Sequence, residues 1–77
     1  MIEVYIELRN NIPLGQLISN LRTLNVDIEG IQFEEDISVD SDVRAFILTI
    51  KSARRRNHLQ FIDDIRKIDG IVHVEGL

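Results

Sequence analysis

Hydrophobic and polar residues alternate along residues 2–9, a pattern that predicts a strand with one buried face. Farther along, hydrophobic residues recur every three or four positions up to Leu24, which predicts an amphipathic helix. The two patterns meet at residues 10–15, Asn-Asn-Ile-Pro-Leu-Gly, so we expect the chain to turn there. Pro13 suits a first helical turn because its missing N–H would have no partner in that position. Asn25 suits the end of the helix because Asn tolerates the left-handed conformation.

The rest of the chain continues this alternation of strands and helices. Residues 26–35 predict a second strand, with a bulge at Gly30 where the phase of the hydrophobic residues changes. Residues 43–51 predict a third strand, and hydrophobic residues fill both of its phases, as in a central strand. A second helix is expected to start near Asn57, a favourable capping residue, and to stop before Gly70, with a short last strand after it.

This order of elements predicts the α+β fold class. In the ferredoxin-like βαββαβ arrangement, four strands form one antiparallel sheet and two helices cover one of its faces. Right-handed crossovers place the first and third strands in the centre and the second and fourth at the edges. The largely hydrophobic third strand agrees with a central position.

Composition narrows the classes of function. The 77 residues suffice for one domain with one small core, and we expect residues 1–77 to be a single domain of a larger protein. The absence of cysteine excludes disulfides, thiolate catalysis and cysteine-based zinc sites. A net charge of −4 argues against nucleic-acid binding. No hydrophobic stretch is long enough to span a membrane, and Glu3 and Glu7 interrupt the N-terminal one, so we expect a cytoplasmic location.

The polar residues form no recognisable catalytic or metal-binding arrangement. His58 and His73 lie in different predicted elements without the spacing of metal ligands, so we expect no enzyme, no cofactor and no metal. The acidic stretch from Glu34 to Asp42 lacks the glycine of a calcium-binding loop and predicts a solvated connection. The basic residues 54–56 suit either an anionic partner or plain solvent exposure.

Several short motifs, in this order along the chain, resemble the ACT domain. Members of that family have an acidic residue and Pro-Gly before a leucine-rich helix, a small polar residue followed by Ile in the second strand, and Gly-Val-x-x-Val in the last strand. The residues that match are Gly15, Leu17, Ile18, Asp27, Ile28 and Gly70 to Val74. The chain departs from the family where Leu14 separates Pro13 from Gly15, and where Asn10 or Asn11 stands at the acidic position. It looks most like the C-terminal cytoplasmic domain of MgtC/SapB-type membrane proteins.

The resemblance implies that the turn before the first helix holds a small ligand such as an amino acid. The candidate ligand-binding residues are Asn10, Asn11, Leu14, Gly15 and Gln16. A helix start offers free backbone amides to an anion, here those of residues 14–17, and glycine lets a ligand approach the backbone closely. Asn11 would orient the amine of the ligand. The alternative is that Gly15 merely permits a tight connection between strand and helix.

Two features of the predicted sheet indicate self-association. Its edge strands leave backbone groups unpaired, and its outer face carries Tyr5, Ala45 and Ile47, with Ile31 as a further candidate. We therefore expect a homodimer, unless a parent domain covers these surfaces.

Together these observations predict a non-catalytic regulatory ACT-like domain that senses a small ligand, dimerises and controls an attached domain. The alternative is an interaction or oligomerisation domain at the cytoplasmic end of an MgtC-type membrane protein, without a small ligand. A hydrolase of the acylphosphatase type ranks last because the turn at residues 10–15 contains no arginine.

Overall fold

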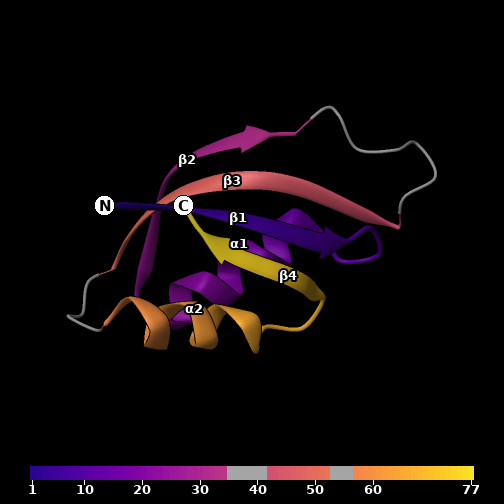
Figure 1. Cartoon of the computed structure of the whole chain (residues 1–77). Helices are drawn as coiled ribbons and strands as arrows, with labels where there is room; N and C mark the ends of the chain where they lie inside the picture. Colours follow the sequence, from indigo (N-terminus) through magenta and orange to yellow (C-terminus); the bar gives the residue numbers. More distant parts are fainter. Residues whose placement is uncertain (35–41, 53–56) are drawn as a thin grey trace.

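The computed structural model describes residues 1–34, 42–52 and 57–77 of the chain. The elements in order are β1 (Ile2–Arg9), α1 (Leu14–Thr23), β2 (Val26–Phe33), β3 (Val43–Ser52), α2 (His58–Arg66) and β4 (Ile71–Gly76). The strands form one four-stranded antiparallel sheet in the order β2-β3-β1-β4, and both helices cover the same face of it (Figure 1). The predicted α+β class and βαββαβ arrangement are therefore confirmed.

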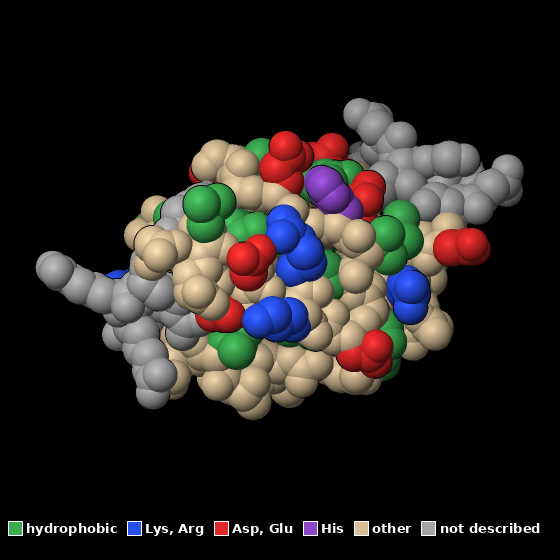
Figure 2. Space-filling view, turned by 60° about the horizontal axis from the view of Figure 1, so that its bottom comes forward, with side chains coloured by type: hydrophobic (Ala, Val, Ile, Leu, Met, Phe, Trp, Pro, Cys, Tyr) green, Lys and Arg blue, Asp and Glu red, His purple; other side chains and the backbone are tan. Residues whose placement is uncertain are grey.

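The core lies between the sheet and the helices. Ile6 of β1 stands opposite Phe46 of β3 on one side and Val74 of β4 on the other, and all three are buried. The helices add Leu17, Leu21, Phe61, Ile62 and Ile65 to the same cluster. Each side chain of this size contributes about 2 kcal/mol when it leaves water, so this layer supplies most of the stabilisation. The outer surface of the helical layer carries interspersed basic and acidic side chains (Figure 2).

Local signals in the sequence are confirmed at the ends of the elements. Asn25 follows α1 with a φ of 61°, and Gly70 follows α2 with a φ of 89°, so both adopt the left-handed conformation. The Asn57 side chain caps α2 by accepting a hydrogen bond from the Gln60 amide at 2.7 Å.

The bulge in β2 is also confirmed, but its consequence corrects one prediction. The register of β2 against β3 shifts between Ile28 and Gly30. Because the bulge absorbs one residue, Ile31 returns to the face that Ile28 occupies. Ile31 therefore lies opposite Leu48 and packs against the core, so its placement on the outer face was wrong.

Two distant connections meet at one end of the sheet. The Arg9 amide, at the end of β1, donates to the carbonyl of Gly70 between α2 and β4 at 2.9 Å. The Ile12 side chain fills the space beside Gly70, where an added Cβ would lie 2.4 Å from Ile12 Cγ1. Close packing and the positive φ both require glycine at this position, which holds the β1–α1 turn in place.

Candidate functional site

The structure divides the candidate ligand-binding residues into two groups, of which only one lines a pocket. Asn10 and Asn11 line an open pocket of about 550 Å³ at the end of β1. Among the described residues, the lining consists of Arg9, Asn10, Asn11, Asp42, Val43 and Val72. Leu14, Gly15 and Gln16 lie in the first turn of α1, outside this lining, and Leu14 packs against the core.

The pocket combines groups that complement a small dipolar molecule. Arg9 supplies a positive charge and Asp42 a negative one, while the two asparagine side chains offer both donors and acceptors. Val43 and Val72 give the lining an apolar part. The Asn10 amide donates to the carbonyl of Asp42 at 2.9 Å, which fixes two walls of the pocket relative to each other. The volume lies within the range of small-molecule sites, roughly 300–1,000 Å³.

A few residues further along the chain, α1 starts without a side-chain cap. Its N-cap residue is Pro13, which accepts hydrogen bonds at its carbonyl from the amides of Gln16 and Leu17. Among the described residues, the amides of Leu14 and Gly15 have no acceptor. The sequence suggested the backbone amides of residues 14–17 as donors to an anion, and only these two of the four remain available for that role.

Gly15 is not required by close packing. A Cβ built on this residue meets no other heavy atom within 4 Å, and its φ lies outside the left-handed region. An alanine would therefore fit, so the geometry does not support the view that glycine is needed for a tight connection. The backbone at Gly15 is open to the surroundings instead.

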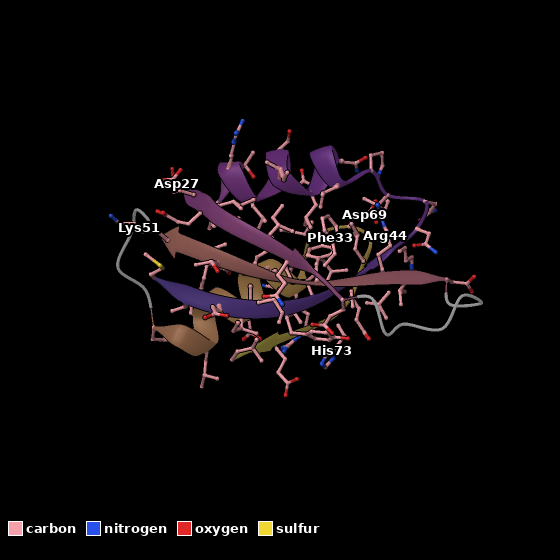
Figure 3. The ribbon with its side chains drawn as sticks, turned by 90° about the horizontal axis from the view of Figure 1, so that it is seen from above. Asp27, Phe33, Arg44, Lys51, Asp69 and His73 are labelled. Atoms are coloured by element: carbon pink, nitrogen blue, oxygen red, sulfur yellow. The ribbon has the colours of Figure 1, made fainter. Side chains whose placement is uncertain are left out.

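Arg44 is a contributor to this turn that the sequence analysis missed. It lies opposite Leu8, on the helix-covered side of β3, and reaches the β1–α1 turn (Figure 3). Its guanidinium donates to the carbonyl of Ile12 and, at 3.4 Å, to that of Arg9. Its buried Nε has no acceptor among the described residues. The available signal was a charged residue in the inward phase of β3, in line with Phe46 and Leu48.

The outer face of the sheet carries a polar cluster around Tyr5. The Tyr5 hydroxyl donates to Glu7 at 3.0 Å, and its ring meets the His73 ring edge-on at a centroid distance of 6.1 Å. Burial raises the pKa of the Tyr5 phenol, and the hydrogen bond and negative charge of Glu7 raise it further, with smaller effects from Glu34 and Glu75. The apolar residues predicted for this face are largely covered, since Ala45 is buried and Tyr5 and Ile47 are half-buried.

Of the histidines and the basic run, the structure describes only the side chain of His73. His73 is exposed on β4, with Nε2 3.8 Å from a carboxylate oxygen of Glu75. Within residues 1–34, 42–52 and 57–77, no three His, Cys, Asp or Glu side chains come together to hold a metal ion. Residues 54–56 and the side chain of His58 lie outside the described part of the structure.

Comparison with known proteins assigns no family to this geometry. No protein-family model matches the chain, and no curated protein matches it. None of the described helices is long and hydrophobic enough to cross a membrane.

Proposed function

We propose that this chain is a non-catalytic regulatory domain of ACT-like fold that binds a small amino-acid-like ligand. The observation that carries the proposal is the uncapped start of α1. Within the described residues, the amides of Leu14 and Gly15 have no acceptor, and they lie only a few residues along the chain from Asn10 and Asn11, which line the pocket. Backbone amides at a helix start suit a carboxylate, and the asparagine side chains suit the amine of the same molecule.

The way in which a bound ligand would act follows from the anchoring of the turn. The β1–α1 turn is tied to the start of β3 through Asp42 and to the α2–β4 connection through Gly70. A ligand that favours one conformation of this turn would therefore shift the conformational equilibrium of a domain attached to those segments. An attached domain would respond to the ligand through this shift.

The alternative function is an interaction domain at the cytoplasmic end of an MgtC-type membrane protein, without a small ligand. The observation in its favour is the outer face of the sheet, which the helices leave uncovered and where Tyr5 and Ile47 are half-buried. Pairing with a second copy, or with a parent domain, would remove these side chains from water.

Thermal unfolding in the presence of amino acids separates the two functions. We expect at least one amino acid at millimolar concentration to raise the Tm, because a ligand that binds the folded state stabilises it by mass action. The control is the same concentration of sodium acetate and of methylamine, which each carry one half of the dipolar group. If none of the amino acids changes the Tm, the sensing function is wrong and the interaction domain is the better account.

A further inference from the structure

The outer face of the sheet carries a hydrophobic stripe along β3. Both helices lie on the other face and leave this one uncovered (Figure 1). The stripe consists of Val43, Ala45 and Ile47, which share the outward phase of β3, and of the Tyr5 ring, which stands opposite Ile47 on β1. Ala45 is buried, and the other three side chains are half-buried. Because outward positions of a half-exposed antiparallel sheet are usually polar, a hydrophobic row on its central strand indicates a surface for contact.

Carboxylates flank the stripe on both sides. On one side, the Glu34 amide donates to the carbonyl of Ala45 at 3.0 Å, so Glu34 stands directly beside the stripe. On the other side, Glu7 lies in the outward phase of β1, and Glu75 of β4 stands opposite Tyr5. Burial raises the pKa of the Tyr5 phenol, and the negative charges of all three carboxylates raise it further. The three charges therefore act together on the centre of this face.

The basic side chains of this face lie mainly at its two ends. Arg9 ends β1 beside the pocket, and Lys51 lies at the other end of β3, opposite Asp27 (Figure 3). His73 of β4 stands nearer the centre, opposite Glu7. The helical layer differs, because basic and acidic side chains are interspersed there (Figure 2). Among the described residues, the outer face thus concentrates negative charge around its hydrophobic stripe.

This distribution of charge selects the kind of molecule that can cover the face. The phosphates of nucleic acid, anionic lipid headgroups and the same face of a second copy all carry negative charge and would be repelled. A helix with a hydrophobic stripe between two rows of Lys or Arg has the complementary pattern. Helices also pack readily on sheet faces, as α1 and α2 do on the other side. From Val43 to Ile47 the stripe spans about 13 Å, the length of about nine helical residues.

We propose that the outer face of the sheet docks a basic amphipathic helix of a partner protein. The hydrophobic stripe along β3 contacts the apolar side chains of that helix, and Glu7, Glu34 and Glu75 bind its Lys and Arg side chains from both sides. This inference goes beyond amino-acid sensing, because the helices of the chain, and with them the start of α1, lie on the opposite face of the sheet.

Tyrosine fluorescence gives a readout that is specific to this face. Tyr5 is the single tyrosine of the chain, and the chain contains no tryptophan. The probe is a helical peptide of about 18 residues of Leu, Ala and Lys, with a leucine stripe between two rows of lysine. We expect this peptide to protect Tyr5 from acrylamide quenching in a saturable manner. An analogue with Glu in place of every Lys should give no protection.

Charge variants of the full chain locate the contact. Glu7→Gln/Glu34→Gln/Glu75→Gln neutralises the carboxylates on both sides of the stripe, and we expect the peptide to bind about tenfold more weakly in isothermal titration calorimetry. Ile47→Thr keeps a branched side chain but removes apolar surface from the stripe, and should weaken binding about threefold. Urea unfolding verifies that each variant remains folded.

The matched control changes the net charge by the same amount elsewhere. Asp63→Asn/Asp64→Asn/Asp69→Asn neutralises three carboxylates of α2 and of the connection after it. Because these groups are not on the outer face, we expect the affinity for the peptide to stay within about twofold of that of the parent chain.

Three results would overturn the proposed docking site. Equal weakening by both triple variants would mean that the peptide responds only to the net charge of the chain. An unchanged affinity in Ile47→Thr would exclude the hydrophobic stripe from the contact. Protection of Tyr5 that grows with the concentration of the chain alone would show that a second copy covers this face. None of these results affects the Tm increase expected with amino acids, so the two proposals fail independently.

Discussion

The two halves of this chain, β1-α1-β2 and β3-α2-β4, share one shape but differ where each helix begins. In the second half, the Asn57 side chain caps α2 by accepting a hydrogen bond from the Gln60 amide, while the Leu59 amide has no acceptor among the described residues. In the first half, Pro13 offers no side-chain acceptor, and two amides stay open at the start of α1. The same fold therefore contains one helix start with a side-chain cap and one without.

The edge strands of the two halves differ in a corresponding way. β2 presents the carboxylates of Asp27 and Glu29, whereas β4 presents His73 and Glu75, one basic and one acidic side chain.

The largest expected effect concerns the joint between the halves, where Ile12 packs on Gly70. Gly70→Ala forces a side chain into the left-handed conformation and against Ile12, so we expect the free energy of unfolding to fall by about 3 kcal/mol. Urea unfolding measures the loss. In the double variant Gly70→Ala/Ile12→Ala, the clash should be relieved, but the cost of the left-handed backbone should remain. If Gly70→Ala lowers the free energy of unfolding by less than about 1 kcal/mol, the packing described here is contradicted.

The next largest loss of stability is expected when the side-chain cap of α2 is removed. Asn57→Ala removes the acceptor for the Gln60 amide, and we expect a loss of about 1 kcal/mol in the free energy of unfolding. Pro13→Ala is the matched change at α1, where no side-chain bond exists to be lost, and should cost clearly less. Equal losses from the two variants would mean that the two helix starts do not differ as described.

Gly15→Ala separates a structural role from a binding role. Alanine fits at this position and favours a helix more than glycine, so we expect the protein to gain up to about 1 kcal/mol of stability. The added methyl group would obstruct a ligand at the open backbone, so the Tm increase caused by an amino acid should shrink. A stabilised variant that still responds fully to the amino acid would show that Gly15 does not contact the ligand.

The smallest effect belongs to the outer face. The native state holds the Tyr5 proton more tightly than the unfolded state, because burial and Glu7 raise the pKa of the phenol. The free energy of unfolding should therefore fall as pH rises above about 10, through the raised pKa. In Glu7→Gln, we expect the phenol to ionise at lower pH in an ultraviolet absorbance titration. An unchanged titration would contradict the role of Glu7.

Periodicity and local chemistry were enough to predict much of this fold. The elements, the bulge near Gly30, the left-handed residues Asn25 and Gly70 and the cap at Asn57 all follow from short stretches of sequence. Simple alternation could not predict which face of the sheet Ile31 occupies, because the bulge adds one residue and returns Ile31 to the face of Ile28.

The surroundings of the candidate site were harder to predict because they depend on tertiary contacts. Asp42 and Val72 are distant from Asn10 in sequence and reach the pocket only through the strand order. Arg44 could be recognised as a charge in a buried phase, but the carbonyls that it binds become known only when the turn is placed against β3.

The most direct test of the account compares the two helix starts in one experiment. In a ¹⁵N-labelled sample titrated with an amino acid that raises the Tm, the account predicts chemical-shift changes at Leu14, Gly15 and the neighbouring Asn10 and Asn11. It predicts little change at Leu59 and Gln60, at the capped start of α2. Shifts of equal size at both helix starts, or shifts absent from residues 10–15, would contradict it.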